Sequence, residues 1–557
     1  MDASDYDLKS VKLPYLSGIL LRHFVSLIES PLGKMVIPQL LDSAGVTGFR
    51  QLRYDDAPVV HPLAYVGLLN TQGKKDSIEA CAEAAGTEPA VSGRGFQFET
   101  VHDFGHAYRE NQISPTQVAE NVIDAINKSN GATPPLRAII TSYADNLREQ
   151  AAASTERYVR GQTLGPLDGV PIAIKDEFDM VPYPTTVGTK FLGQSPVTED
   201  ATAVARLRAA GALLIGKANM HEIGLGVTGF NAHHGTVRNP YNVEYYTGGS
   251  SSGPAAAVAA GLCPVALGAD GGGSIRIPAA FCGVVGLKPT FGRVSEYGAA
   301  PLTWSMAHIG PLGATAADAA LVYAAIAGPD TKDKMSWHQP APINVGWESG
   351  DVEGITLGVF WSWFRHASAE VVAVCEQALS RFEKMGACIR EISIPDLEAG
   401  RVAHTVTIAG EIAQSMDRYY TQHRKDFSQE TRINLALARA FNASDFILSQ
   451  RVRARAITNF NQALSEVDVI VTPMTGLPAP HIPEDSLPDG DSDLTTLVEI
   501  MRFATISNLT GFPAISFPVG YTPGGLPVGL QGIARPWDEM ILLRMAEAAE
   551  KFVERQE

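Results

Sequence analysis

Two glycine-rich runs that carry serines constrain the fold of this chain more than any other feature. The first is Gly248-Gly249-Ser250-Ser251-Ser252-Gly253, and the second is Asp270-Gly271-Gly272-Gly273-Ser274-Ile275-Arg276. Residues 265–268, just before the second run, are apolar and typical of a short buried strand. Because glycine permits positive φ and close backbone approach, we expect each run to form a tight loop.

Strand and helix patterns alternate along the chain. Residues 170–174 alternate like a strand, with Val170, Ile172 and Ile174 on one face. The same patterns predict strands at 212–215, 265–268 and 467–472 and helices at 116–128, 143–160 and 199–210. Alternating strands and helices predict an α/β fold. The 557 residues exceed the size of one ordinary core, although α/β enzymes with one large sheet reach this length.

The first part of the chain differs from the rest. Residues 1–95 are predicted to form an N-terminal helical extension on a main domain of residues 96–557. Within residues 16–41, apolar side chains recur at helical spacing in two stretches. One interpretation is a helix pair packed on the main domain, and the other is an interfacial pair that makes peripheral contact with a membrane.

Composition excludes some classes of partner. The formal net charge is −16, so the chain lacks the basic footprint of a nucleic-acid-binding protein, and neutral small molecules fit better as substrates. Five scattered cysteines predict neither a metal site nor a disulfide framework. The acidic start lacks a signal peptide, which predicts an intracellular protein that is not secreted.

Lys175 ends the predicted strand at 170–174, where α/β proteins place ligand sites. A serine hydroxyl is a weak nucleophile that needs a base, and burial favours the neutral, basic form of a lysine. Lys175 and the two serine runs therefore suggest a nucleophile activated without histidine. The alternative for Lys175 is a structural ion pair with Asp176 or Glu177.

The run Gly271, Gly272 and Gly273 suits an oxyanion hole, because successive backbone N–H groups in such a loop can bind an anion. Ser274 directly follows and would be the nucleophile, while Asp270 and Arg276 flank it as a supporting pair. Phosphate binding is the competing use, but the known phosphate-loop spacings are absent. A purely structural bulge is the third alternative.

A second serine also matches a catalytic pattern. Residues 249–253 fit Gly-x-Ser-x-Gly, which would make Ser251 the nucleophile of an α/β-hydrolase with a late histidine such as His481. This interpretation leaves Lys175 and the second glycine run unexplained. The histidines at 221, 233 and 234 show no metal-ligand spacing, so we predict no metal site.

Taken together, the motifs resemble the amidase signature family. The block from Gly248 to Arg293 resembles the defining segment of that family, and residues 169–176 and 216–240 also match. The resemblance covers roughly residues 100–540 and implies a large mixed central β-sheet flanked by helices on both faces. It implies an amide-cleaving enzyme that needs no cofactor.

The resemblance also implies a role for each matching residue. Lys175 would be the base, Ser250 a serine in a cis peptide that relays the proton, and Ser274 the nucleophile that forms an acyl-enzyme. Gly271, Gly272, Gly273 and Ser274 would supply the oxyanion hole. The supporting residues would be Ser251, Ser252, Asp270 and Arg276.

Departures from the commonest family pattern narrow the expected substrate. Ser252, Pro254 and Gly271 resemble the plant-type fatty acid amide hydrolases, as does the N-terminal helical extension. This branch implies hydrophobic acyl amides such as N-acylethanolamines, and a homodimer. Two alternatives stay open: an amidase or urethanase of small amides, carbamates or esters, and an amidotransferase A-like subunit that needs partner chains.

Overall fold

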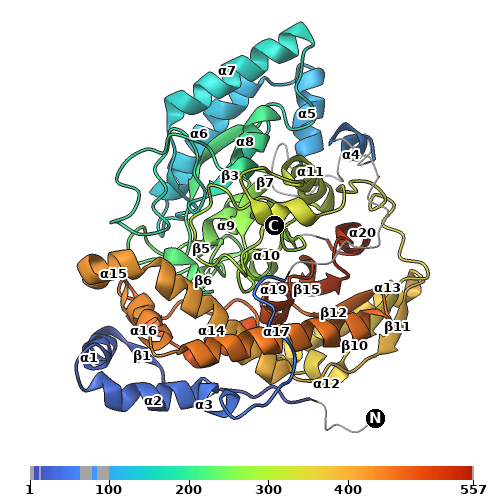
Figure 1. Cartoon of the computed structure of the whole chain (residues 1–557). Helices are drawn as coiled ribbons and strands as arrows, with labels where there is room; N and C mark the ends of the chain where they lie inside the picture. The colour runs from blue at the N-terminus through green and yellow to red at the C-terminus, as the bar shows by residue number, and fades with distance from the viewer. Residues whose placement is uncertain (1–5, 12–13, 63–77, 85–99, 555–557) are drawn as a thin grey trace.

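A computed structural model describes residues 6–11, 14–62, 78–84 and 100–554, and its main feature is one large sheet (Figure 1). The sheet has eleven strands and confirms the predicted mixed α/β architecture. In spatial order the strands are β11 (Cys388–Glu391), β10 (Thr356–Val359), β12 (Val469–Pro473), β15 (Pro527–Ala534), β14 (Ala514–Tyr521), β8 (Val285–Lys288), β9 (Ile309–Gly313), β7 (Val265–Ala269), β3 (Pro171–Lys175), β4 (Leu213–Ala218) and β2 (Ile139–Thr141).

The sheet direction changes along this order. β7, β3 and β4 are parallel neighbours, and so are β11, β10 and β12, whereas the strands between these groups are antiparallel. Since β3 and β7 run in the same direction, their carboxyl ends lie at the same edge of the sheet. Lys175 ends β3, and the second glycine run follows β7, so this pairing brings the two predicted catalytic segments together.

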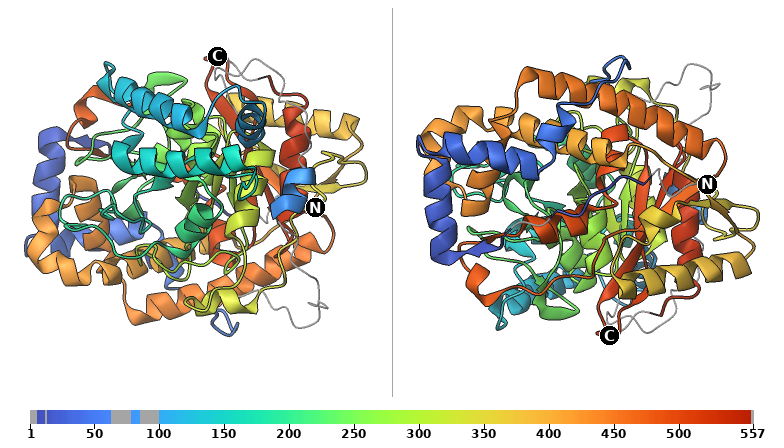
Figure 2. Two further views of the ribbon diagram at one scale, coloured as in Figure 1. Left: turned by 90° about the horizontal axis from the view of Figure 1, so that it is seen from above. Right: turned by 90° about the horizontal axis from the view of Figure 1, so that it is seen from below.

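Helices cover both faces of the sheet (Figure 2). Val469 and Val471 of β12 pack in the core that holds α13 (Ala369–Lys384) and α20 (Glu539–Glu550). Ile470 points to the other face, into the core that holds α14 (Leu397–Ser415) and α17 (Ala443–Leu464). Side chains of a strand alternate between faces, so this split shows a sheet buried on both sides.

The remaining helices form the edges and layers around this frame. Among the described residues they are α3 (Val46–Phe49), α4 (Ile78–Ala84), α5 (Val101–Arg109), α6 (Pro115–Gly131), α7 (Ala144–Arg160), α8 (Thr202–Ala209), α9 (Ser252–Ala259), α10 (Arg276–Phe281), α11 (Ala316–Ile326), α12 (Trp361–Phe364), α15 (Asp417–His423), α16 (Gln429–Ala438), α18 (Leu494–Met501) and α19 (Thr505–Thr510). Short β5 (Arg238–Asn239) and β6 (Asn242–Tyr246) form a separate hairpin.

Local sequence signals place several of these helices correctly. Ser114 caps α6 through a reciprocal capping box with Gln117, and Pro115 occupies the first helical position. α7 ends at Gly161, which adopts the left-handed conformation that favours glycine. The sequence pattern predicts one helical stretch over residues 430–464, but the structure divides it into α16 and α17. Asn442 caps the start of α17, which explains the break.

The N-terminal extension packs on the main domain through two helices, α1 (Gly18–Ile28) and α2 (Gly33–Ser43). Leu21, Val25 and Ile28 of α1 are buried against Ile433 of α16. The residue pair β1 (Leu16–Ser17) adds to β13 (Asp491–Ser492) in an antiparallel pair. The predicted boundary at residue 95 lies outside the described residues, so the division into two domains stays a prediction.

The opposite side of this helix pair is apolar and exposed. Ile19, Leu20 and Met35 are 70%, 67% and 77% exposed, respectively. In the part of the chain that the structure describes, no helix combines the length and apolar character needed to cross a membrane.

Candidate active site

Lys175 lies buried at the end of β3 and has three partners. Its Nζ lies 2.9 Å from Ser250 Oγ, 3.2 Å from the Ala269 carbonyl oxygen and 2.7 Å from Glu177 Oε2. The structure thus places Lys175 in contact with both Ser250 and Glu177, the two kinds of partner considered for it. Asp176, the other acid considered for this ion pair, instead lies 3.3 Å from Lys217 Nζ.

The two serine runs lie side by side. The Ser251 N–H donates to the Ser274 carbonyl oxygen at 3.1 Å, and the Ser250 carbonyl oxygen accepts from the His221 N–H at 3.1 Å. The Gly249–Ser250 peptide bond is cis. These contacts hold Ser250 between Lys175 and the segment that carries Ser274.

A buried ion pair anchors the second glycine run. Asp270 and Arg276 are fully buried, and Arg276 Nε donates to Asp270 Oδ2 at 3.0 Å. Burial alone would raise the pKa of Asp270, but Arg276 and the backbone donors hold it well below its usual range. Asn508 of α19 adds a side-chain donor 2.9 Å from Asp270 Oδ1. The Asp270–Arg276 pair therefore ties the glycine run to α10 and α19.

Some backbone N–H groups of the glycine run donate to Asp270, and others have no acceptor in the described part of the protein. Gly273 N–H donates to Asp270 Oδ1 at 2.6 Å, and Ile275 N–H donates to Asp270 Oδ2 at 3.1 Å. Gly273 has φ of +111°, a conformation that favours glycine. Within the described residues, the N–H groups of Gly271, Gly272 and Ser274 donate to no protein acceptor. These three donors are free to bind an anion.

His404 of α14 supports the same run from the opposite side, and sequence patterns gave no signal for it. Its Nε2 lies 2.9 Å from the Gly271 carbonyl oxygen, so this nitrogen carries a proton and donates. Burial lowers the pKa of His404 to about 4, which keeps the ring neutral. A Cβ on Gly272 would lie 2.8 Å from the His404 ring, so glycine is required there. The sequence patterns did not predict α14 itself.

An apolar cavity of about 160 Å³ opens beside Ser274. Gly272 and His404 line it together with apolar side chains from α14, α18 and the loops between elements, including Leu225, Val227, Ile408, Phe441, Leu497 and Met501. Val11 and Ala44 of the N-terminal extension also reach its wall. A neighbouring open cavity of about 490 Å³ shares Ala438 and Phe441 with it. Ala438 and Phe441 therefore lie in the wall of both cavities.

The α/β-hydrolase alternative finds no support in this geometry. Ser251 is fully buried, and its Oγ donates to the Ala269 carbonyl oxygen at 3.1 Å. His481 instead stacks edge-on against Tyr245 and lies 3.8 Å from Glu244. Ser252 begins α9, where its Oγ lies 3.5 Å from the Asn219 carbonyl oxygen. Ser251 and Ser252 therefore contact the backbone around the site.

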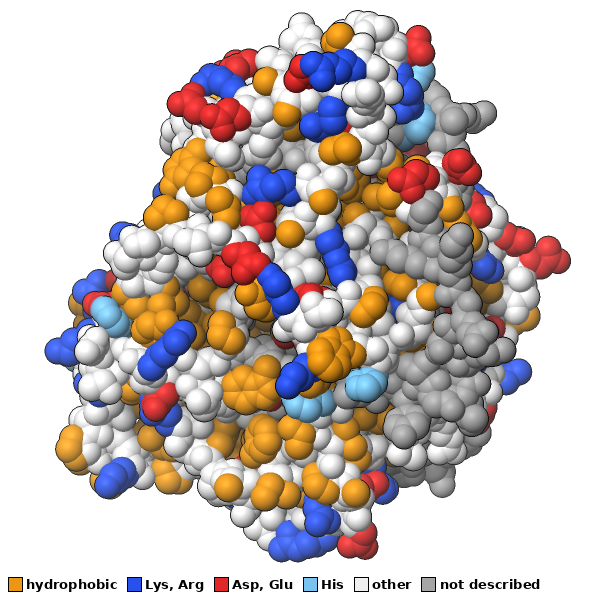
Figure 3. All heavy atoms as spheres, turned by 45° about the horizontal axis from the view of Figure 1, so that its top comes forward, with side chains coloured by type: hydrophobic (Ala, Val, Ile, Leu, Met, Phe, Trp, Pro, Cys, Tyr) orange, Lys and Arg blue, Asp and Glu red, His pale blue; other side chains and the backbone are white. Residues whose placement is uncertain are grey.

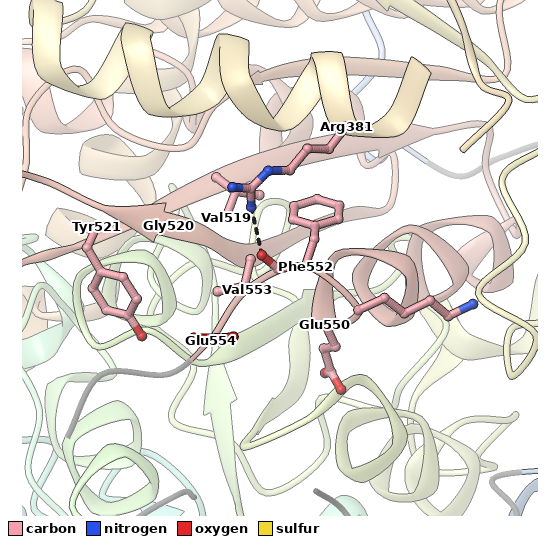
Figure 4. Close-up of a pocket in the computed structure, with 9 residues that line it drawn as sticks. Arg381, Val519, Gly520, Tyr521, Glu550, Phe552, Val553 and Glu554 are labelled. Atoms are coloured by element: carbon pink, nitrogen blue, oxygen red, sulfur yellow. Dashed lines mark hydrogen bonds between the residues drawn. The ribbon is translucent and has the colours of Figure 1, made fainter. Parts of the chain in front are cut away.

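Other candidate sites offer less chemistry. Among the described residues, no group of three or more His, Cys, Asp or Glu side chains is arranged to hold a metal ion. A further pocket lies between α13, the end of β14 and the chain after α20 (Figure 4). There Arg381 donates to the Phe552 carbonyl oxygen at 2.7 Å, and the pocket shares no residue with the cavity at Ser274.

Comparisons with known proteins show the family and the fold to which this chain is similar. A profile of the amidase family matches residues 120–543. The fatty acid amide hydrolase of Oryza sativa subsp. indica is 40% identical over 99% of this chain and 95% of its own length. The A-type subunit of the glutamyl-tRNA(Gln) amidotransferase of Moorella thermoacetica is 35% identical over 82% of this chain and 96% of its own length. A peptide amidase solved with the inhibitor chymostatin is 30% identical, covers 81% of this chain and 97% of its own, and superimposes with a TM-score of 0.71.

The fold and these matches define an amide-cleaving serine hydrolase. The chain belongs to the amidase signature family, and its similarity to plant fatty acid amide hydrolases extends over nearly its full length.

Proposed function

We propose that this enzyme hydrolyses hydrophobic acyl amides, such as N-acylethanolamines, through Lys175, Ser250 and Ser274. The observation that carries the proposal is the apolar cavity beside Ser274, which would receive the acyl chain of the substrate. The contact of 2.9 Å between Lys175 Nζ and Ser250 Oγ supports the roles of these two residues. Similarity to the plant relatives supports the substrate class.

The proposed reaction has two halves. Neutral Lys175 takes the proton of Ser250 Oγ, Ser250 takes that of Ser274 Oγ, and Ser274 forms a bond to the carbonyl carbon. The N–H groups of Gly271, Gly272 and Ser274 stabilise the oxyanion, whereas the Gly273 N–H is occupied by Asp270. Ser250 then gives a proton to the leaving amine as the C–N bond breaks. Water then replaces the amine: Ser250 takes a proton from the water as the water oxygen bonds to the acyl carbon, and Ser250 returns a proton to Ser274 Oγ as the ester bond breaks.

The cavity volume bears on the length of the acyl chain. About 160 Å³ is below the ~300–1,000 Å³ typical of pockets for drug-sized ligands. A long acyl chain would therefore need further space, and the neighbouring open cavity shares Ala438 and Phe441 with the first. We propose that rotation of Phe441 joins the two cavities when a long-chain substrate binds.

A substrate panel separates this proposal from the alternatives. We expect the purified chain to hydrolyse an N-acylethanolamine with kcat/KM at least tenfold above that for acetamide or an alkyl carbamate. Equal or better hydrolysis of the small substrates would favour the amidase or urethanase alternative. Acyl-amide activity only after addition of partner chains would favour the amidotransferase A-like alternative, which the 35% identity to the Moorella protein keeps relevant.

We also propose that the exposed apolar side chains of α1 and α2 rest on a lipid surface, which would bring an acyl amide close to the cavity wall that Val11 and Ala44 form. Figure 3 brings the upper side of Figure 1 forward and shows Lys and Arg mixed with Asp and Glu there. The helices α1 and α2 themselves carry few charged side chains, namely Arg22, Lys34 and Asp42. We therefore expect binding to neutral vesicles that Ile19→Asp with Met35→Asp abolishes. A homodimer that covers the same face is the other proposal, and light scattering of the same variant tests it.

A further inference from the structure

Glu177 is a buried carboxyl that the relay described above does not use. Its side chain is 6% exposed, and its Oε2 lies 2.7 Å from Lys175 Nζ, whose side chain is 1% exposed. Its backbone carbonyl accepts from the Ala300 N–H at 2.8 Å, which fixes the chain just beyond β3. This geometry places the Glu177 carboxyl directly against the amine of the proposed base.

The number of partners around Lys175 matches both of its protonation states. An ammonium has three N–H bonds, which Ser250 Oγ, the Ala269 carbonyl oxygen and Glu177 Oε2 would accept. A neutral amine has two N–H bonds and one lone pair. Since the Ala269 carbonyl and the Glu177 carboxylate can only accept, they take the two N–H bonds, and the lone pair faces the Ser250 hydroxyl. This is the direction that proton removal from Ser250 requires.

We propose that Glu177 is the positioning residue of Lys175; this inference rests on the proposed relay. Glu177 would aim the lone pair of the Lys175 amine at Ser250 and supply the counter-charge when that amine becomes an ammonium. During the relay the Ser250 O–H bond breaks and a new N–H bond forms on Lys175. The Glu177 carboxylate keeps its charge throughout. Before the transfer it faces a neutral amine, and after the transfer it forms an ion pair with the Lys175 ammonium. Glu177 thus favours the protonated product of the transfer.

The surrounding charges leave this role to Glu177. Glu177 is one of the acids that, together with burial, raise the pKa of Glu296 well above its usual range. This shift disfavours a second negative charge at Glu296. Asp176 lies beside Lys217, so these two offset each other. The Asp270 carboxylate beyond Ala269 is engaged by Arg276.

Two substitutions separate the charge of Glu177 from its position. Glu177→Gln keeps an acceptor oxygen and removes the charge, so the acid limb of labelling by a fluorophosphonate probe should move to lower pH by about one to three units. Glu177→Met removes the acceptor as well. Its labelling rate at the plateau of the pH profile should therefore be at least tenfold below that of Glu177→Gln. Glu177→Asp should return the acid limb toward that of the unmodified enzyme.

The control is Glu539→Gln, which removes another fully buried carboxyl that contacts Thr290 and Tyr323. Its acid limb should match that of the unmodified enzyme. An unshifted acid limb in Glu177→Gln would overturn the inference, and so would equal plateau rates in the Gln and Met variants. If one variant fails to fold, the remaining variants still test the shift or the plateau. Probe labelling that persists in Ser274→Ala would instead refute the proposed function, so the two failures are distinguishable.

Discussion

Asp270→Asn is the substitution whose two effects can be worked out most fully from the structure. The change keeps the shape of the side chain but removes the charge that faces Arg276 inside a fully buried pair. Breaking a buried pair by removing one partner costs about 3–5 kcal/mol. With an unfolding entropy of about 2.1 cal/mol/K per residue over 557 residues, this loss lowers Tm by about 3–4 °C if the chain unfolds as one unit.

The same substitution should also disturb the proposed oxyanion hole. An asparagine has one acceptor oxygen in place of two, so Gly273 N–H and Ile275 N–H cannot both keep their present acceptors. The loop then loses the conformation that leaves the other N–H groups free. Loss of one oxyanion donor typically costs 10²–10³ in rate, so we expect fluorophosphonate labelling to slow by at least about 100-fold.

Differential scanning calorimetry and the labelling rate measure the two effects on the same sample. Asp445→Asn is the matched control, because Asp445 is a buried carboxylate that pairs with Arg50 at 2.8 Å and accepts from the Asn442 N–H at the start of α17, away from the glycine run. It should lower Tm while leaving the labelling rate unchanged. An Asp270→Asn enzyme with a lowered Tm and the original labelling rate would refute the claim that Asp270 shapes the loop.

Three further predictions concern the cavity, the oxyanion loop and the N-terminal extension. Phe441→Ala should join the two cavities and raise kcat/KM for a long acyl chain relative to a short one, as a chain-length series measures. Gly272→Ala would bring a Cβ within 2.8 Å of the His404 ring and should slow labelling at least tenfold, with partial recovery when His404→Ala is added. Burial raises the pKa of Asp491 to about 7, so the folded state favours its protonated form. That stability is present below about pH 4 and is lost as pH rises through 7. Asp491→Asn should therefore flatten the fall of Tm between about pH 4 and 7, as thermal scans at each pH measure.

Much of the site could be predicted because its signals are local. Each signal is local to its own segment: glycines directly flank Ser250 and precede Ser274, and an alternating strand pattern ends at Lys175. The parallel pairing of β3 and β7 then brings Lys175 to these serines, as an α/β interpretation requires. The capping box at Ser114 likewise placed the start of α6 correctly.

The parts that were missed depend on contacts between distant segments. His404 and Asn508 reach the glycine run from α14 and α19, and no periodicity or spacing in the sequence links them to it. The use of Gly273 N–H by Asp270 depends on loop geometry that residue types alone leave open. The two interpretations of Lys175 stand as alternatives in the sequence, yet a buried amine has enough hydrogen-bonding capacity for both Ser250 and Glu177.

The central claim is that Ser274 is the residue acylated during turnover. The most direct measurement is mass spectrometry of proteolytic peptides after treatment of the purified enzyme with a fluorophosphonate probe. We predict that the probe is found on Ser274 and that Ser274→Ala abolishes both labelling and amide hydrolysis, while Ser251→Ala retains labelling at Ser274. Probe mass on Ser250 or Ser251, or continued amide hydrolysis by Ser274→Ala, would contradict the account.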